Sequence, residues 1–225
     1  MKAIIITGAG SGLGKELSLL LAKQGYHMIL TGRTEDKLLD VQAQIEQSEG
    51  SATTLELDIR NLEDVKEKAI LLSKKFNLYG LVNNAGVGYF GPFSDVSDQE
   101  IEGMFQTNVF GTIHMTKAIL PYLELNQEGL VLNIVSTAGL RGKKNEAVYC
   151  SSKFAVRGFT ESMQKEYKGT GIRFVAAYMG GMDTPFWEGS DHVADSSRFR
   201  TAAEVADIIM NSLEKDEIVI ESKKS

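Results

Sequence analysis

Cysteine is almost absent from this sequence of 225 residues. Cys150 is the single one, so the chain can form no internal disulfide and no metal site built from several thiolates. Such sparing use of cysteine fits a reducing compartment, and we expect the cytoplasm. The histidines are His27, His114 and His192, far apart and without the spacing of metal ligands. We therefore expect no metal site.

Long apolar runs and clustered positive charge are also missing. The apolar start, Ala3–Ile6, stops at Thr7-Gly8, too early for the core of a secretion signal, and no later run approaches the length of a membrane span. The net charge is −6, and no stripe of Lys and Arg occurs. Nucleic-acid binding needs clustered positive charge to neutralise phosphates. We therefore expect binding neither to membranes nor to nucleic acids.

Proline is scarce, with three residues, whereas 43% of the chain is apolar. This composition predicts one globular domain over residues 1–225 with a large core and no linker. Strand-like and helix-like segments alternate along it. We expect strands at 2–7, 26–31, 52–57, 79–83, 130–135, 172–177 and 217–221. We expect helices at 15–23, 63–75, 99–125, 148–168 and 202–213, and a further helix that follows Thr34 and ends at Gln47. Alternation of this kind predicts an α/β fold: a doubly wound (Rossmann) parallel sheet of about seven strands, with helices on both faces.

A glycine-rich turn connects the first strand to the first helix. Its glycines stand at positions 8, 10, 12 and 14. Glycines let the backbone approach a pyrophosphate, while free amides and the positive end of the helix dipole face the anion. After the second strand, Gly32 offers no carboxylate to a ribose hydroxyl, and Arg33 can clamp a phosphate. We therefore expect a dinucleotide site that prefers NADP(H), with NAD(H) possible.

Tyr149 and Lys153 are four residues apart in a helix-compatible segment, so both side chains face the same way. A phenol with a pKa of about 10 is a poor proton shuttle at neutral pH. A cation ~4 Å away supplies roughly the 4 kcal/mol needed to correct this. The pair alone is also common on solvated helix surfaces. The pair is more significant here because Asp58 follows one expected strand and Asn83 ends another, at the sheet edge where doubly wound folds bind ligands.

With these motifs placed, the chain resembles the short-chain dehydrogenase/reductase family over nearly its whole length. Thr7-Gly8-x-x-x-Gly12-x-Gly14 matches the family's cofactor loop, and Asn83-Asn84-Ala85-Gly86 its strand-four motif. One departure is Met179-Gly180, where the family commonly has Pro-Gly. The positions that match the active-site tetrad are Asn108, Ser136, Tyr149 and Lys153.

The resemblance implies an NAD(P)-dependent enzyme that acts on CH–OH or C=O groups. Tyr149 would be the acid or base on the substrate oxygen, and Lys153 would hold the nicotinamide ribose and lower the phenol's pKa. Ser136 would bond the carbonyl, Asn108 would position a water, and Asp58 would contact the adenine. The implied cofactor-binding residues are Gly8, Ser11, Gly12, Leu13, Gly14, Arg33, Asp58, Asn84, Ala85, Gly86, Tyr149, Lys153, Met182 and Thr184.

The segment at about 180–200 predicts a substrate lid. We expect the pocket wall to be mostly apolar and to favour a ketone or aldehyde with an apolar body. The expected wall residues are Val87, Tyr89, Phe90, Phe93, Leu140, Phe186 and Trp187. The helix at 99–125 is apolar over about half its circumference, more than one sheet contact needs. It therefore predicts a subunit interface, in a homodimer formed with the helix at 148–168. An unusually thick core layer is the alternative.

Other functions fit less well. No serine has the glycine spacing of a hydrolase elbow. Arg141, Lys143 and Lys144 could hold an acidic substrate, although such a run is more often solvated. A non-catalytic dinucleotide-binding regulator is the alternative, but it would need neither Tyr149 nor Ser136. A methyltransferase with a similar nucleotide-binding architecture is a distant third. We therefore expect a reductase of a small-molecule carbonyl substrate.

Overall fold

The computed structural model describes residues 1–188, 190 and 192–222. Its main sheet contains seven parallel strands in the order β3-β2-β1-β4-β5-β6-β9. The strands are β1 (Lys2–Thr7), β2 (His27–Gly32), β3 (Ser51–Glu56), β4 (Asn77–Asn83), β5 (Gly129–Ile134), β6 (Ile172–Met179) and β9 (Glu217–Ile220). The doubly wound fold is thus confirmed. The strand order reverses between β1 and β4, which opens a crevice at their carboxyl ends.

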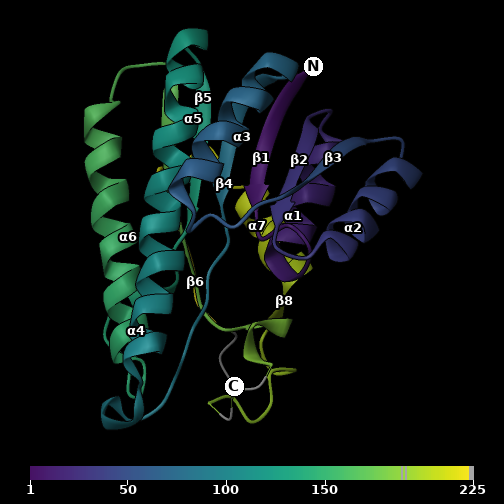
Figure 1. Ribbon diagram of the computed structural model, residues 1–225. Helices are drawn as coiled ribbons and strands as arrows, with labels where there is room; N and C mark the ends of the chain where they lie inside the picture. Colours follow the sequence, from purple (N-terminus) through teal and green to yellow (C-terminus); the bar gives the residue numbers. More distant parts are fainter. Residues whose placement is uncertain (189, 191, 223–225) are drawn as a thin grey trace.

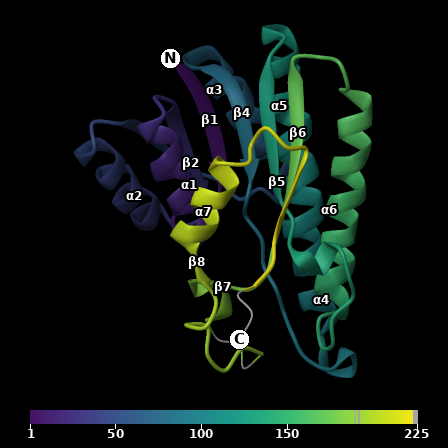
Figure 2. The ribbon, with the colours of Figure 1, turned by 180° about the vertical axis from the view of Figure 1, so that it is seen from behind.

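Helices cover both faces of this sheet (Figures 1 and 2). They are α1 (Gly12–Lys23), α2 (Glu35–Gln47), α3 (Leu62–Lys75), α4 (Asp98–Met104), α5 (Thr112–Asn126), α6 (Ala147–Glu166) and α7 (Ala202–Met210). In β1, Ile4 and Ile6 pack with α1, α2 and α7, whereas Ala3 and Ile5 pack with α3 and α5. Because successive residues of a strand point to opposite faces, a strand covered on both sides is apolar throughout.

The prediction of a single helix at 99–125 is wrong in one respect. Its middle, Phe105–Gly111, is π-helical, and it separates α4 from α5. Wider turns of this type are frequent at functional sites. Here the Asn108 side chain bonds Val87, and the Asn108 carbonyl accepts from the hydroxyl of Thr112. The bonds to Val87 come from tertiary packing, so the apolar periodicity on either side gives no sign of them.

The segment after β6 leaves the main sheet, and its two ends pair in a separate two-stranded ladder. The two-residue strands β7 (Met182–Asp183) and β8 (Arg200–Thr201) pair in parallel, and a 3₁₀ turn at Pro185–Trp187 lies between them. The described residues of 184–199 therefore form an excursion whose two ends meet at one short ladder. In the part of the chain that the structure describes, no helix is long and apolar enough to cross a membrane.

Candidate active site

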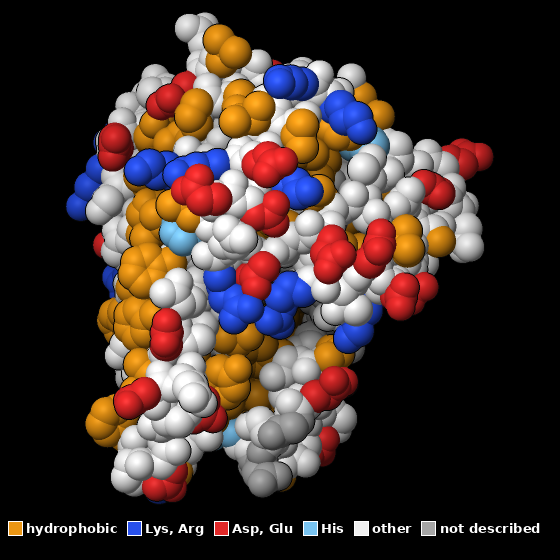
Figure 3. Space-filling model, viewed as in Figure 1, with side chains coloured by type: hydrophobic (Ala, Val, Ile, Leu, Met, Phe, Trp, Pro, Cys, Tyr) orange, Lys and Arg blue, Asp and Glu red, His pale blue; other side chains and the backbone are white. Residues whose placement is uncertain are grey.

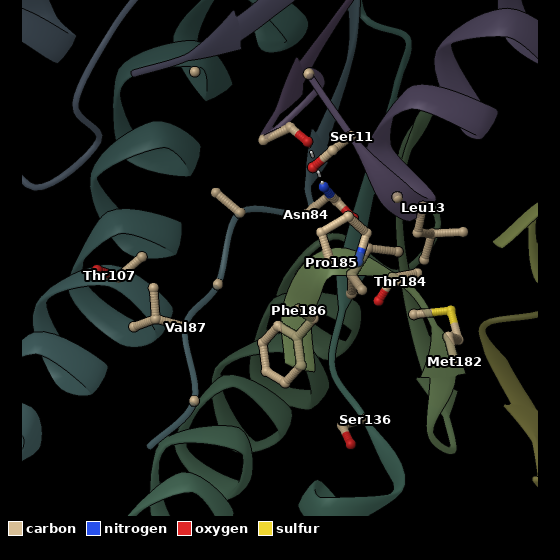
Figure 4. A pocket seen from close by; sticks show the side chains of 18 of the residues that line it. Ser11, Leu13, Asn84, Val87, Thr107, Ser136, Met182, Thr184, Pro185 and Phe186 are labelled. Carbon is tan, nitrogen blue, oxygen red and sulfur yellow. Dashed lines mark hydrogen bonds between the residues drawn. The ribbon is translucent and has the colours of Figure 1, made fainter. Parts of the chain in front are cut away.

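The glycine-rich turn is packed too tightly for side chains. Gly8 and Gly12 have φ values of 65° and 52°, which other residues rarely adopt. A Cβ on Gly14 would lie 2.3 Å from the Gly8 carbonyl oxygen. The loop is tied to the end of β4, because Asn84 Nδ2 donates to the Thr7 and Gly8 carbonyls at 2.9 and 3.2 Å (Figure 4). The turn is thus a fixed cradle facing the crevice.

Basic side chains rim the crevice beside the end of β2. Arg33, Lys37 and Arg60 all line it, and Figure 3 shows Lys and Arg side chains gathered above a hollow with a hydrophobic floor. Arg60 donates to both carboxylate oxygens of Asp58, to Oδ2 at 2.6 Å and to Oδ1 at 2.9 Å, and this hydrogen bonding lowers the pKa of Asp58. A Cβ on Gly10 would lie 2.9 Å from the Lys37 Cβ.

The sequence analysis missed Lys37 and Arg60. One sign of Lys37 was available, since it lies in the first turn of α2, a few residues after Arg33. Arg60 gave no such sign, because its place depends on its bidentate contact with Asp58.

Tyr149 and Lys153 lie together on α6 and are 8% and 6% exposed. Lys153 Nζ is 5.7 Å from the centroid of the Tyr149 ring and donates to the Ile134 carbonyl at 3.1 Å. Burial raises the pKa of Tyr149, and a hydrogen bond with Ser136 acts against that rise. Burial also lowers the pKa of Lys153 to about 8. The protein alone therefore keeps the phenol protonated, as a proton donor must be.

Ser136 stands directly after β5 in a backbone conformation that is rare for a side-chain-bearing residue, with φ at 142°. Its Oγ accepts from the Ala138 amide at 3.1 Å, which leaves the hydroxyl proton to be donated. Among the described residues, Ser136 is the group that lowers the pKa of Tyr149. The lowering of that pKa by Lys153 stays a prediction.

Asn108 and Gly14 do not line the cavity but support it. Asn108 Oδ1 accepts from the Val87 amide at 2.8 Å, and Nδ2 donates to the Val87 carbonyl at 2.9 Å and to Ser152 Oγ at 3.0 Å. The side chain thus fixes the loop after β4 against α6. Its expected part in positioning a water stays a prediction.

One cavity of about 510 Å³ extends from the cradle to the 180–200 segment. The remaining site residues of the sequence analysis all line it, as Figure 4 shows in part. These are Gly8, Ser11, Gly12, Leu13, Arg33, Asp58, Asn84, Ala85, Gly86, Ser136, Tyr149, Lys153, Met182 and Thr184. The structure therefore brings these residues together, while the role of each stays a prediction.

The far end of the cavity is largely aromatic. Val87, Tyr89, Phe186 and Trp187 line it, and Phe90 packs edge-on against Tyr149 at 5.3 Å. The expectation was wrong for Phe93, which is 67% exposed in the short turn Phe93–Asp95. Leu140 does not line the cavity either and instead packs with the core beside α6. Phe90 is also not a lining residue, although its ring contacts Tyr149, Phe186 and Trp187.

Two of the three basic residues in the run after Ser136 lie beside protein carboxylates. Arg141 makes two bonds to Glu221, at 2.7 and 3.0 Å, and Lys143 Nζ lies 3.8 Å from Glu146 Oε2. Nothing here favours Arg141 as a ligand for an acidic substrate. Among the described residues, no three His, Cys, Asp or Glu side chains gather as metal ligands would.

A glycine cradle at a strand-order reversal, facing a buried Tyr–Lys pair, defines a dinucleotide-binding fold equipped for acid–base chemistry. Comparison with known proteins gives the family. The family model described as short chain dehydrogenase matches residues 2–194. The chain therefore belongs to the short-chain dehydrogenase family, and it is an oxidoreductase of that class.

Several relatives and solved structures are similar to it. An uncharacterized oxidoreductase of Staphylococcus epidermidis is 30% identical over 191 residues, covering 84% of this chain and 82% of the relative. The sepiapterin reductase of Chlorobaculum tepidum is 28% identical, with 97% and 93% covered. The alcohol dehydrogenase of the archaeon Thermococcus sibiricus, solved with 5-hydroxy-NADP, is 28% identical with a TM-score of 0.86, with 98% and 94% covered. ElxO, solved with NADP bound, is 27% identical with a TM-score of 0.86, with 98% and 97% covered.

Proposed function

We propose that this protein is an NADP(H)-dependent reductase of a small ketone or aldehyde with an apolar body. The observation that carries this proposal is the placement of Tyr149 and Ser136 on one cavity, between the glycine cradle and the aromatic end. A nicotinamide in the cradle would be held close to a carbonyl that rests on the aromatic side chains. The whole chain acts as one dehydrogenase domain, with residues of the 180–200 segment as its substrate lid.

The protein's own groups support carbonyl reduction. Negative charge develops on the substrate oxygen as hydride arrives, so donors must be aimed at that atom. Ser136 donates its hydroxyl proton in a hydrogen bond, and Tyr149, held protonated by burial, transfers its proton to the oxygen. The cationic form of Lys153 assists this transfer by stabilising the phenolate that remains. When bound, NADPH supplies the hydride.

The preference for NADP(H) over NAD(H) rests on the basic rim. Arg33, Lys37 and Arg60 line the cavity next to Gly32, where an NAD-selective site would carry a carboxylate. A 2′-phosphate would be bound there by charge-assisted hydrogen bonds. Two similar structures, the Thermococcus sibiricus alcohol dehydrogenase and ElxO, were solved with NADP-type ligands. Reduction is the proposed direction.

Thermal unfolding with NADPH, NADH and S-adenosylmethionine tests the cofactor without a substrate. A nucleotide at about 100 times its dissociation constant adds ~2.7 kcal/mol of stability. We expect NADPH to stabilise most, NADH less and S-adenosylmethionine not at all. NADPH oxidation with a panel of aldehydes and ketones then tests the reaction. If neither NADPH nor NADH stabilised the protein, the proposal would be refuted.

A homodimer in the cytoplasm completes the proposal. Phe110 and Phe154 are 45% and 43% exposed, and the segments that carry them pack side by side. Two large exposed aromatic side chains on neighbouring helical segments suit an interface between copies. Sedimentation of wild type and of a Phe110→Ser, Phe154→Ser variant tests this, with a dimer expected only for wild type. A wild-type monomer at micromolar concentration would refute the dimer.

A further inference from the structure

A buried carboxylate lies at the aromatic end of the cavity without a part in the proton transfer. Glu146 is 8% exposed, directly precedes α6 and lines the cavity with Tyr149. Its Oε1 is 3.1 Å from His192 Nε2, and its Oε2 is 3.8 Å from Lys143 Nζ. Because burying an unpaired carboxylate is costly, these two partners account for its presence there.

His192 reaches this carboxylate from the segment between β7 and β8. Its ring stacks on Phe90, with centroids 4.8 Å apart and planes at 19°, and lies 6.3 Å from the ring of Trp187. Phe90 in turn packs edge-on against Tyr149. The His192 ring is thus the outer layer of an aromatic stack that ends at the phenol.

The contact also joins two parts of the chain that are otherwise held together by apolar packing. In the described part of segment 185–199, His192–Glu146 is the hydrogen bond that reaches outside residues 182–199. The remaining contacts of this segment with the pocket are ring contacts, such as Phe186 with Phe90 and Tyr149.

We propose that Glu146 and His192 form a substrate-positioning pair. The hydrogen bond holds the described part of segment 185–199 so that Phe186 and Trp187 form an aromatic wall of the cavity beside Tyr149. Phe90 packs against both rings and is tilted by 34° from that of Trp187. Such a wall selects carbonyl compounds with a flat aromatic body, because offset or edge-on ring contacts orient them. The kinetic part of this proposal rests on the proposed reductase function.

Trp187 allows the pair to be tested without any substrate. It is the single tryptophan of the chain, so protein fluorescence reports on the wall alone. The variants are His192→Ala, which removes ring and hydrogen bond, and Glu146→Met, which removes the hydrogen bond at similar side-chain length. We expect acrylamide quenching of Trp187 to rise about twofold in both variants, because loss of the pair opens local structure.

His27→Ala is the matched control. His27 is also half-buried, stacks on Phe76 at 4.7 Å and bonds Ser51 and Thr53, but it lies at the amino end of β2, away from the carboxyl ends of the strands. Its replacement should lower the unfolding temperature and leave quenching unchanged. Unchanged quenching in both pocket variants would overturn the proposal, whatever their activity.

Kinetics with NADPH and p-nitrobenzaldehyde test the positioning role. Loss of a hydrogen bond to a charged group should raise KM about tenfold and leave kcat within about twofold. The double variant should be no worse than His192→Ala, because both changes remove one interaction. Increased quenching with an unchanged KM would reduce the pair to a structural contact and overturn the positioning role. Failure of the wild type to oxidise NADPH would count against the proposed function. Trp187 quenching would still show whether the Glu146–His192 pair fixes the segment.

Discussion

The cofactor end of the cavity is held by the backbone, whereas the substrate end is held by side chains. In the cradle, Gly14 packs against the Gly8 carbonyl, and the Thr7 hydroxyl accepts from the amides of Asn84 and Ala85, both at 3.0 Å. At the other end, the contacts are aromatic rings and the His192–Glu146 hydrogen bond.

This difference predicts how each end responds to change. A backbone contact leaves no room for a new side chain, so a change in the cradle should affect folding and nucleotide binding together. Rings on loops can move, so a change at the substrate end should affect KM before stability. Ser136 and Tyr149 lie where the two ends meet, and they should affect the chemical step.

The largest effect is expected from Tyr149→Phe. Loss of the proton donor should lower kcat about a thousandfold, within the range of general acid catalysis, while both ends of the cavity remain intact. NADPH binding, measured by thermal shift, should be unchanged. Tyr167→Phe is the control, because Tyr167 bonds Glu124 at the surface. A Tyr149→Phe enzyme with wild-type turnover would rule out the proposed mechanism.

A pair of glycine substitutions compares the two ends directly. In Gly14→Ala the new Cβ would meet the Gly8 carbonyl oxygen at 2.3 Å, and in Gly88→Ala it would meet the rings of Phe90 and Phe186 at 2.4 and 2.8 Å. We expect Gly14→Ala to lose about 3 kcal/mol of stability and to bind no NADPH, because backbone cannot move aside. Gly88→Ala should lose about 1 kcal/mol and show a raised KM.

Urea unfolding and substrate titration measure this contrast. Gly103→Ala, in α4 with a nearest contact of 3.6 Å, is the control and should be neutral or slightly stabilising. Equal losses of stability in Gly14→Ala and Gly88→Ala would show that the two ends are equally rigid.

Lys153 should give the protein without nucleotide an unusual dependence on pH. Burial lowers its pKa to about 8, whereas a lysine in the unfolded chain titrates at 10.5. Between these values the unfolded state binds more protons, so stability rises with pH from about 8 towards 10.5, and the cost of the buried ammonium is fully present below 8. Relative to Lys153→Met, the wild type should gain about 2 kcal/mol between pH ~7 and pH ~10.

Urea unfolding at several pH values measures this gain, and the difference between the two proteins removes the contribution of every other titrating group. Lys165→Met changes an exposed position of α6 and is the control, because its stability should change with pH as that of the wild type does. If the stability of Lys153→Met changed with pH in the same way as that of the wild type, the lowered pKa of Lys153 would be contradicted.

The smallest effect is expected at the basic rim, where side chains rather than backbone serve the cofactor. Arg33→Ala should reduce the preference for NADPH over NADH about tenfold through loss of a charge-assisted contact. Lys37→Ala should reduce it less, since a point charge lacks bidentate geometry. Dissociation constants from thermal shifts check both. Arg173→Ala is the control, since Arg173 is paired with Asp216 outside the cavity. If the preference for NADPH survived in both rim variants, Arg33 and Lys37 would be excluded as its source.

Sequence patterns predicted the cofactor end better than the substrate end, for a physical reason. The seven strands, the glycine turn and the shared face of Tyr149 and Lys153 all follow from local periodicity and spacing, which the chain carries within a few residues. The expected helix at 99–125 contained the π-helical turns around Asn108, which depend on a bond to Val87, 21 residues away.

The substrate end depends on contacts over longer separations. His192 lies 46 residues from Glu146 in the sequence, and no periodicity relates the two. Phe93 was expected in the wall because it is aromatic and close to Phe90, yet it points to solvent. Side chains on loops are placed by their neighbours in space. The composition therefore predicted that the pocket is aromatic, but not which residues line it.

The ladder of β7 and β8 has a consequence for how this chain can change. Met182 pairs with Arg200 and Asp183 with Thr201, so residues 184–199 leave and re-enter the fold about one strand spacing apart, ~4.8 Å. A loop with anchored ends can be lengthened at little entropic cost, ~0.6 kcal/mol for each doubling. The segment is therefore an exchangeable cassette: another sequence with the same two ends could be grafted there to give a new substrate range on an unchanged hydride-transfer scaffold.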